Sequence, residues 1–236
     1  MRIVGVPAAG RPTEVSVLVG HGDDPRALLW DRGYFVQRVL SVSGPATDLV
    51  LTVQVAPHQH PGTTLPVRDH GVDPGVAFPA GVRPVKRQRL AAYAIVLSSR
   101  GLLATQFSSL TAVPGLWGLP GGGMDGSETA ADAVVREVYE EAGQHVEIDH
   151  VLDVQSDHWI GQAPSGALED FHALRLIYAA SCPRPTEPVV QDVGGTTAAA
   201  RWLPPRRWRR LSWTSGFRML LVKHLEPLLP AQVGAS

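Results

Sequence analysis

Hydrophobic and polar positions follow a strand-like pattern over the first 56 residues. Stretches rich in β-branched residues predict strands at 15–19, 34–40 and 49–55. Asp24 followed by Pro25 predicts the start of a short helix that Gly33 ends. We therefore expect a small α+β module over residues 1–56. It is too short to be stable alone, so it should pack on the rest of the protein or on a second copy of the chain, as a homodimer.

Residues 57–85 break this pattern with recurring prolines and glycines, which predict a linker or an extended loop. They also include His58, His60 and His70. A metal site on these histidines is one interpretation, and polar side chains in a surface loop are the simpler one.

From residue 90 onward the apolar runs predict buried strands at 90–97, 102–107, 151–154, 171–179 and 200–204. Residues 157–170 are more polar and predict a loop. The basic run 205–211 is typical of a solvated helix start, with recruitment of a polyanion as the alternative. Apolar residues at helical spacing predict a terminal helix over 216–225.

Composition narrows the class of protein. The chain has 236 residues, is 44% hydrophobic and 18% charged, and carries a formal net charge of -1, so nothing in it favours nucleic-acid or membrane binding. Its one cysteine, Cys182, allows neither an intramolecular disulfide nor a cysteine-based zinc site. Gly5 and Pro7 interrupt any apolar leader, so we expect a cytoplasmic protein.

One predicted helix carries an unusual charge pattern. It begins near residue 129, ends at Ala142, and is followed by Gly143, which suits the left-handed position after a helix. At about 100° per residue, three carboxylates share one arc, and apolar residues predict a separate core-facing stripe. The carboxylates are Glu137, Glu140 and Glu141, and the stripe is Ala131, Val135, Val138 and Ala142. Carboxylates near the negative end of a helix repel one another, and a cation would relieve this.

A bare Glu-x-x-Glu-Glu is more often a solvated acidic face, but here it follows a glycine-rich loop at fixed spacing. The whole stretch closely resembles the signature box of the Nudix hydrolase superfamily, and the resemblance covers about residues 86–226. Only Gln144 departs from the box, where an aliphatic residue is usual. The matching residues are Gly122, Glu128, Arg136, Glu137, Val138, Glu140, Glu141 and Gly143.

The resemblance implies an α/β fold: a Nudix-type α/β/α sandwich with a mixed, curved sheet over residues 86–226. The small N-terminal module at 1–56 and the linker at 57–85 would precede it, and a tail at 227–236 would follow.

The resemblance also implies a metal site for Mg²⁺ or Mn²⁺. Its ligands would be Glu137, Glu140 and Glu141, with the carbonyl of Gly121 as an additional ligand and Glu128 as an auxiliary one. Hard cations of this kind prefer oxygen ligands. Arg136 would orient a glutamate. The implied reaction is hydrolysis of a diphosphate linked to another moiety.

Substrate contacts are expected outside the box. In the resembled fold, the segment 157–170 borders the substrate cleft, where Glu169 or Asp170 would be an extra ligand or a general base. His158 would act as an acid or contact phosphate. The alternative is an ordinary hairpin with polar residues. Trp117 and Trp159 would stack on a base or pack in the protein.

Three functions stay open from the sequence. The first is a metal-dependent hydrolase of a nucleoside diphosphate derivative: a nucleotide sugar, ADP-ribose or a nucleoside triphosphate. The second is a non-catalytic Nudix-like module that senses a nucleotide, although no box glutamate is missing. The third is hydrolysis of a non-nucleotide diphosphate, such as a prenyl diphosphate.

Overall fold

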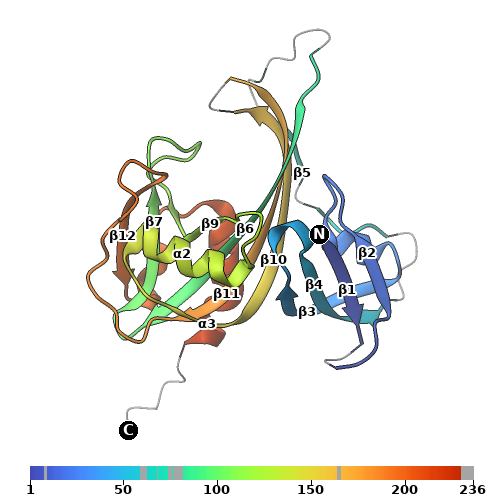
Figure 1. The fold of residues 1–236 in the computed structure, drawn as a ribbon, viewed down its shortest axis with the longest axis horizontal. Coiled ribbons are helices and arrows are strands. Elements are labelled where there is room, and N and C mark those ends of the chain that lie inside the picture. The colour runs from blue at the N-terminus through green and yellow to red at the C-terminus, as the bar shows by residue number, and fades with distance from the viewer. Residues whose placement is uncertain are drawn as a thin grey trace. The chain divides into compact units, whose positions relative to one another are not determined.

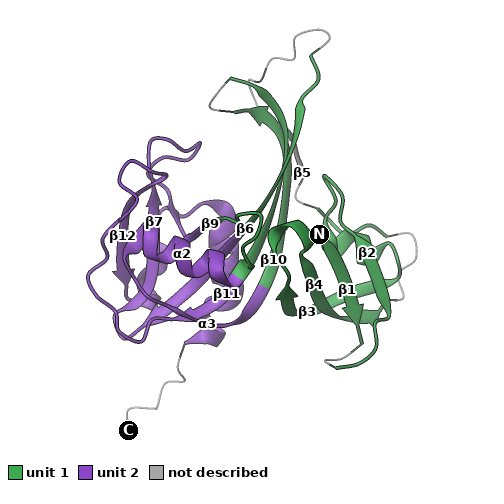
Figure 2. Cartoon of the chain, viewed as in Figure 1, with its two compact units in different colours: residues 1–91, 123–130, 153–176 green, residues 92–122, 131–152, 177–236 purple. Residues whose placement is uncertain are grey.

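The computed structural model describes residues 1–7, 10–58, 63–67, 69–73, 76, 82–163 and 166–229 (Figure 1). These residues form two compact units, each assembled from three stretches of the chain (Figure 2). Unit 1 comprises Met1–Ala91, Gly123–Ala130 and Asp153–Leu176, and unit 2 comprises Ala92–Gly122, Ala131–Leu152 and the described part of Ile177–Ser236. No helix in the described ranges is both long and apolar enough to cross a membrane.

The N-terminal module in unit 1 is a four-stranded mixed sheet of order β2-β1-β4-β3. The central strands β1 and β4 run parallel, and each pairs antiparallel with an edge strand. The predicted strands and helix are confirmed, and the Asp24 side chain caps α1 by accepting from the backbone N–H groups of Arg26 and Ala27. The elements are β1 (Arg2–Val6), β2 (Val15–Leu18), α1 (Pro25–Trp30), β3 (Tyr34–Ser43), η1 (Ala46–Asp48) and β4 (Val50–Pro57).

The strand β1 was absent from the sequence prediction, because a five-residue segment that contains a glycine has little strand character by itself. Its neighbours stabilise it: Ile3 is fully buried, and a Cβ on Gly5 would lie 2.6 Å from the Val15 side chain. Tertiary packing here outweighs local propensity.

The predicted linker contains one described strand, β5 (Asp69–Val72), which pairs parallel with β10. The His58 ring stacks on the Trp30 ring, with the ring centroids 3.8 Å apart. Its Nε2 lies 2.7 Å from the Trp30 carbonyl oxygen. His60 and the side chain of His70 lie outside the described residues.

The second sheet has the strand order β12-β7-β6-β11-β10-β5, with β8 paired to β7 and β9 to β6. It mixes the parallel pair β10–β5 with antiparallel pairs, as the resemblance implied. Its strands are β5, β6 (Val85–Ser98), β7 (Gly101–Phe107), β8 (Trp117–Gly118), β9 (Gly121–Gly123), β10 (Glu147–Gln162), β11 (Leu168–Ser181) and β12 (Thr197–Leu203).

The loop predicted at 157–170 was wrong for most of its length. Residues 157–162 continue β10, and residues 168–170 begin β11. The polar residues of this stretch pair with ion-pair and hydrogen-bond partners such as Arg175 on Asp157, so the strands tolerate them. Polarity alone was therefore a poor sign of a loop here.

Unit 2 has its own hydrophobic core, in which residues from the strands pack against η2 (Pro205–Arg210) and α3 (Ser215–Leu228). The structure confirms the predicted terminal helix and extends it to residue 228. Its buried residues are Phe217, Leu220, Leu221 and Leu225.

Figure 1 shows α2 (Ala130–Ala142) crossing in front of the strands of this unit. Within the basic run, residues 205–210 form the 3-10 helix η2, which buried Trp208 anchors.

Candidate functional site

The helix α2 bears the three glutamates on its last two turns. It ends where predicted, at Ala142, and Gly143 follows with φ 65°, the left-handed conformation that favours glycine. The Gly143 N–H donates to the Tyr139 carbonyl at 2.7 Å and closes the final turn. The local sequence therefore fixes the length of this helix.

The predicted orientation of α2 was wrong. Val138 and Ala142 are buried as predicted, but Val135 is 38% exposed and Ala131 is half-buried. The buried positions instead cluster around Glu141, which is itself only 7% exposed, and the apolar members are Ala130, Ala133, Val134, Val138 and Ala142. The acidic and the buried faces of α2 thus overlap at Glu141, because this carboxylate has polar partners inside unit 2.

Glu141 has those partners on β9 and β12. Its Oε2 accepts from the Gly121 N–H at 3.0 Å, and its Oε1 accepts a short hydrogen bond from the Thr197 hydroxyl. Burial raises the pKa of Glu141 to about 7, and the charges of Glu137 and Glu140 add to this shift. Glu141 therefore fixes α2 to the strands and titrates near neutral pH when no cation is bound.

Glu137 and Glu140 converge on one nitrogen of Arg136. The Arg136 Nη1 donates to Glu137 Oε1 and to Glu140 Oε2, each at 3.0 Å. The side chains of Glu137 and Glu140 are 16% and 42% exposed, so both are reachable from solvent. Charge-assisted hydrogen bonds from one guanidinium hold two carboxylate oxygens together.

The glycine-rich loop makes room for these carboxylates. A Cβ on Gly122 would lie 2.4 Å from Glu137 Oε1, so any side chain there would displace the carboxylate. Gly121 has φ 139°, and a Cβ on it would lie 2.3 Å from the Ala92 carbonyl oxygen. Backbone contacts and a positive φ therefore require glycine at position 121, and a side chain at 122 would move the Glu137 carboxylate.

Two other box residues have local roles. Glu128 belongs to unit 1, where its Oε2 accepts from the Asp125 N–H at 3.0 Å. Gln144, the departure from the box, is buried, and its amide donates to the Ala142 carbonyl and the Thr186 hydroxyl at 3.0 Å each. Its Oε1 accepts from the Thr186 N–H, so a buried amide is satisfied where an aliphatic residue is usual.

Trp117 lies in the core of unit 2. It is 5% exposed, and the Arg201 guanidinium lies 4.3 Å from its ring centroid. This environment favours the packing role over stacking on a base. In unit 1, half-buried Trp159 packs on Phe171, with ring centroids 4.7 Å apart.

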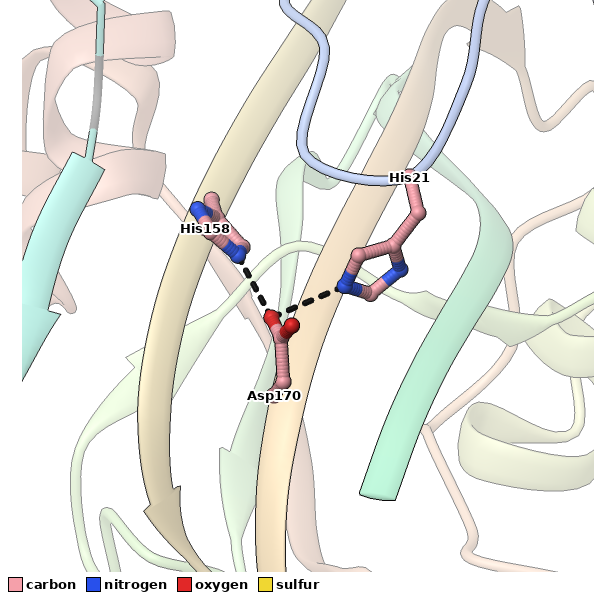
Figure 3. A group of neighbouring side chains, drawn as sticks. All are labelled: His21, His158 and Asp170. Carbon is pink, nitrogen blue, oxygen red and sulfur yellow. Dashed lines mark hydrogen bonds and ion pairs between the residues drawn. The ribbon is translucent and has the colours of Figure 1, made fainter. Parts of the chain in front are cut away.

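His158 and Asp170 meet in unit 1, together with a histidine that the sequence did not single out. His158 Nε2 lies 2.6 Å from Asp170 Oδ1, and His21 Nε2 lies 2.8 Å from the same oxygen (Figure 3). Glu169 instead forms an ion pair with Arg87, with its Oε1 3.3 Å from Arg87 Nε. No local signal marks His21, because about 137 residues separate it from His158 and only the fold brings them together.

The Asp170 carboxylate is stabilised as an anion. Partial burial would raise its pKa, but hydrogen bonds from His21 and His158 outweigh this and lower the pKa of Asp170. Fully buried His172 lies next to this group, and its burial lowers its pKa to about 4, so its imidazole is neutral at pH 7.

The comparisons with known proteins agree with the box. A family model described as NUDIX domain matches residues 87–219, more than half of the chain. The m7GpppN-mRNA hydrolase NUDT17 of Bos taurus is 27% identical over 154 residues, covering 61% of this chain and 45% of that protein. The nucleoside triphosphatase NudI of Enterobacter sp. (strain 638) is 33% identical over 95 residues, covering 39% of this chain and 67% of that protein. The chain thus spans less than half the length of the first relative.

Among solved structures, the Nudix domain of Shewanella oneidensis NrtR in complex with ADP ribose has a TM-score of 0.47 at 20% identity. The match covers 64% of this chain and 96% of that one.

Substitution Gly122→Ala should damage the glutamate site without unfolding the protein. The new Cβ would meet Glu137 Oε1 and push the carboxylate away from Arg136. We expect Mn²⁺ affinity, measured by electron paramagnetic resonance, to fall by about 10-fold or more. The matched control is Gly126→Ala, where the nearest atom to the new Cβ, on Thr47, is 3.7 Å away. Equal Mn²⁺ affinity in both variants would contradict the packing argument.

The free energy of unfolding should depend on pH through Glu141. Its pKa is raised from 4.5 to about 7, so between these values the folded protein keeps a proton that the unfolded chain releases. Stability therefore falls as pH rises through this window, by up to about 3 kcal/mol, and stays low above it.

Glu141→Gln should flatten this dependence. Denaturant unfolding in EDTA at about pH 5 and about pH 8 measures the difference for both proteins. If the wild type and the variant lose stability equally over that range, Glu141 is not the titrating group.

Proposed function

Because the chain belongs to the Nudix family, we propose that it is a divalent-metal-dependent hydrolase that cleaves a diphosphate linkage in a nucleoside diphosphate derivative. The observation that carries the proposal is the convergence of Glu137 and Glu140 on Arg136, beside the glycine-rich loop and above buried Glu141. A solvated acidic face would neither bury a glutamate nor press a carboxylate against a glycine, as Glu137 does against Gly122.

The donor set fits a hard divalent cation. The three side chains offer only carboxylate oxygens, which Mg²⁺ and Mn²⁺ prefer. Burial, and then the charges of Glu137 and Glu140, raise the pKa of Glu141, so a bound cation would favour its ionised form. Glu137, Glu140 and Glu141 would hold the ion, with the Gly121 carbonyl as a further oxygen. When bound, Mg²⁺ neutralises phosphate oxygens and lowers the pKa of water.

Residues around the carboxylates then have positioning roles. Arg136 binds one oxygen of Glu137 and one of Glu140, so it restricts both side chains on one face of α2. Thr197 and the Gly121 N–H set the rotamer of Glu141 from two separate strands. Arg136 thus acts through the glutamates and is not assigned a contact with substrate.

The substrate class rests on the relatives. One is named an mRNA cap hydrolase and the other a nucleoside triphosphatase, and both names describe nucleotide phosphoanhydrides. We therefore favour a nucleotide sugar, ADP-ribose or a nucleoside triphosphate over a prenyl diphosphate. All box glutamates are present, which favours catalysis over nucleotide sensing alone. A panel of these diphosphates, assayed with Mg²⁺ for release of monophosphate, tests the proposal.

Glu140→Gln should lower kcat by about 100-fold or more on the best substrate of that panel, because it removes one of the proposed ligand charges. The fold should persist, since Glu140 is partly exposed. Glu147→Gln, which changes an exposed glutamate at the start of β10, is the control and should keep full activity. Full activity in purified Glu140→Gln would remove Glu140 from the proposed ligand set.

Chelation should abolish turnover. We expect EDTA to reduce hydrolysis to background, and added Mg²⁺ or Mn²⁺ to restore it, because carboxylates alone cannot stabilise charge developing on phosphate. Circular dichroism before and after chelation controls for unfolding. Turnover that resists EDTA would argue against a metal-dependent reaction.

A further inference from the structure

A second group of ligand-type side chains lies in unit 1 and takes no part in the glutamate site. His21, His158 and Asp170 each offer one ligand atom, and these atoms all lie within 4.8 Å of one another. The residues come from the loop before α1, from β10 and from β11, and Figure 3 shows both imidazoles directed at the Asp170 carboxylate. Three separate parts of the chain thus converge on one point.

We propose that His21, His158 and Asp170 bind a first-row divalent transition-metal ion, with Zn²⁺ as the first candidate. Two imidazole nitrogens and one carboxylate oxygen form a donor set that suits Zn²⁺ and its neighbours in the first row. Mg²⁺ and Ca²⁺ favour oxygen ligands only, so this set selects a different ion from the glutamates of α2. Three protein ligands leave a fourth position for water or an anionic group.

The distances suit such an ion with little movement. The two Nε2 atoms lie 2.8 and 2.6 Å from Asp170 Oδ1. Ligands about 2.0–2.2 Å from Zn²⁺ stand about 3.3 Å apart in a tetrahedron, so each contact would open by less than about 1 Å. The three side chains are 18–23% exposed, which leaves a path from solvent while removing part of the hydration.

Fully buried His172 holds the loop that carries His21 in place. The Gly22 N–H and the Gln88 amide both donate to His172 Nδ1, at 3.0 and 2.9 Å. These donors place the His172 proton on Nε2, which lies 2.9 Å from the Ser156 hydroxyl. Gln88 also donates to the Gly20 carbonyl at 3.2 Å. His172 is therefore a positioning residue, and the backbone on both sides of His21 is held in place.

The competing explanation is a hydrogen-bonded node, in which Asp170 simply accepts from two imidazoles and ties the loop to the strands. The two explanations differ in an observable way. A node needs the imidazole proton on each Nε2 and binds no metal, whereas a metal site needs each Nε2 free of hydrogen, with the imidazole proton on Nδ1.

The test uses the full chain, stripped with EDTA and then titrated with Zn²⁺ in excess Mg²⁺, which occupies the glutamates of α2. Calorimetry and elemental analysis after dialysis should give one Zn²⁺ per chain. His21→Asn and Asp170→Asn should each bind Zn²⁺ at least about 100-fold more weakly. The matched control is His150→Gln, an exposed histidine on β10, which should bind as the wild type does. No bound Zn²⁺, or unchanged affinity in both ligand variants, would overturn the proposal.

A second measurement needs no substitution and covers the case in which the variants fail to fold. In ¹⁵N-histidine spectra of the wild type, Zn²⁺ should shift the Nε2 signals of two imidazoles and leave the Nδ1 signal of His172 as an acceptor. If Zn²⁺ moves other histidines, or none, the node explanation holds. Glu140→Gln should still bind this Zn²⁺, so failure of the hydrolase proposal and failure of this one can be told apart.

Discussion

The glutamate site depends on one buried carboxylate. A carboxylate that is 7% exposed costs several kcal/mol unless hydrogen bonds replace its water. Glu141 receives two, from Thr197 on β12 and from the Gly121 N–H on β9. Because these donors sit on separate strands, they fix both the rotation of α2 and its position along the sheet. The other two glutamates are then placed by the geometry of the helix.

The glycine-rich loop follows from the same constraint. The Glu137 carboxylate lies against Gly122, where a Cβ would displace it. Gly121 must adopt φ 139° to direct its N–H at Glu141, and only glycine does so without strain. The glycines and glutamates of the box are therefore parts of one packing solution, and a change in either requires a change in the other.

This explains what the sequence could and could not predict. The end of α2 at Gly143, the cap at Asp24 and the apolar spacing of α3 are local features, and the structure confirms them. The orientation of α2 was predicted wrongly, because a hydrophobic pattern assigns every carboxylate to solvent. The length of β10 was underestimated, since polar residues in its missed part are satisfied by partners elsewhere in the chain, such as Arg175 on Asp157. His21 was missed because only the fold brings it next to His158 and Asp170.

The two proposed metal sites differ in donor chemistry. Unit 2 gathers carboxylates alone, and the group in unit 1 is dominated by imidazoles. Hard and borderline ions choose between such sets by ligand type, so Mg²⁺ and Zn²⁺ would not exclude one another. Imidazole binds a metal ion as a neutral ligand, whereas Glu141, whose pKa is raised to about 7, must lose its proton to bind one. The glutamate site would therefore bind its ion more tightly as pH rises through about 7, and ligand type would decide which ion each site takes.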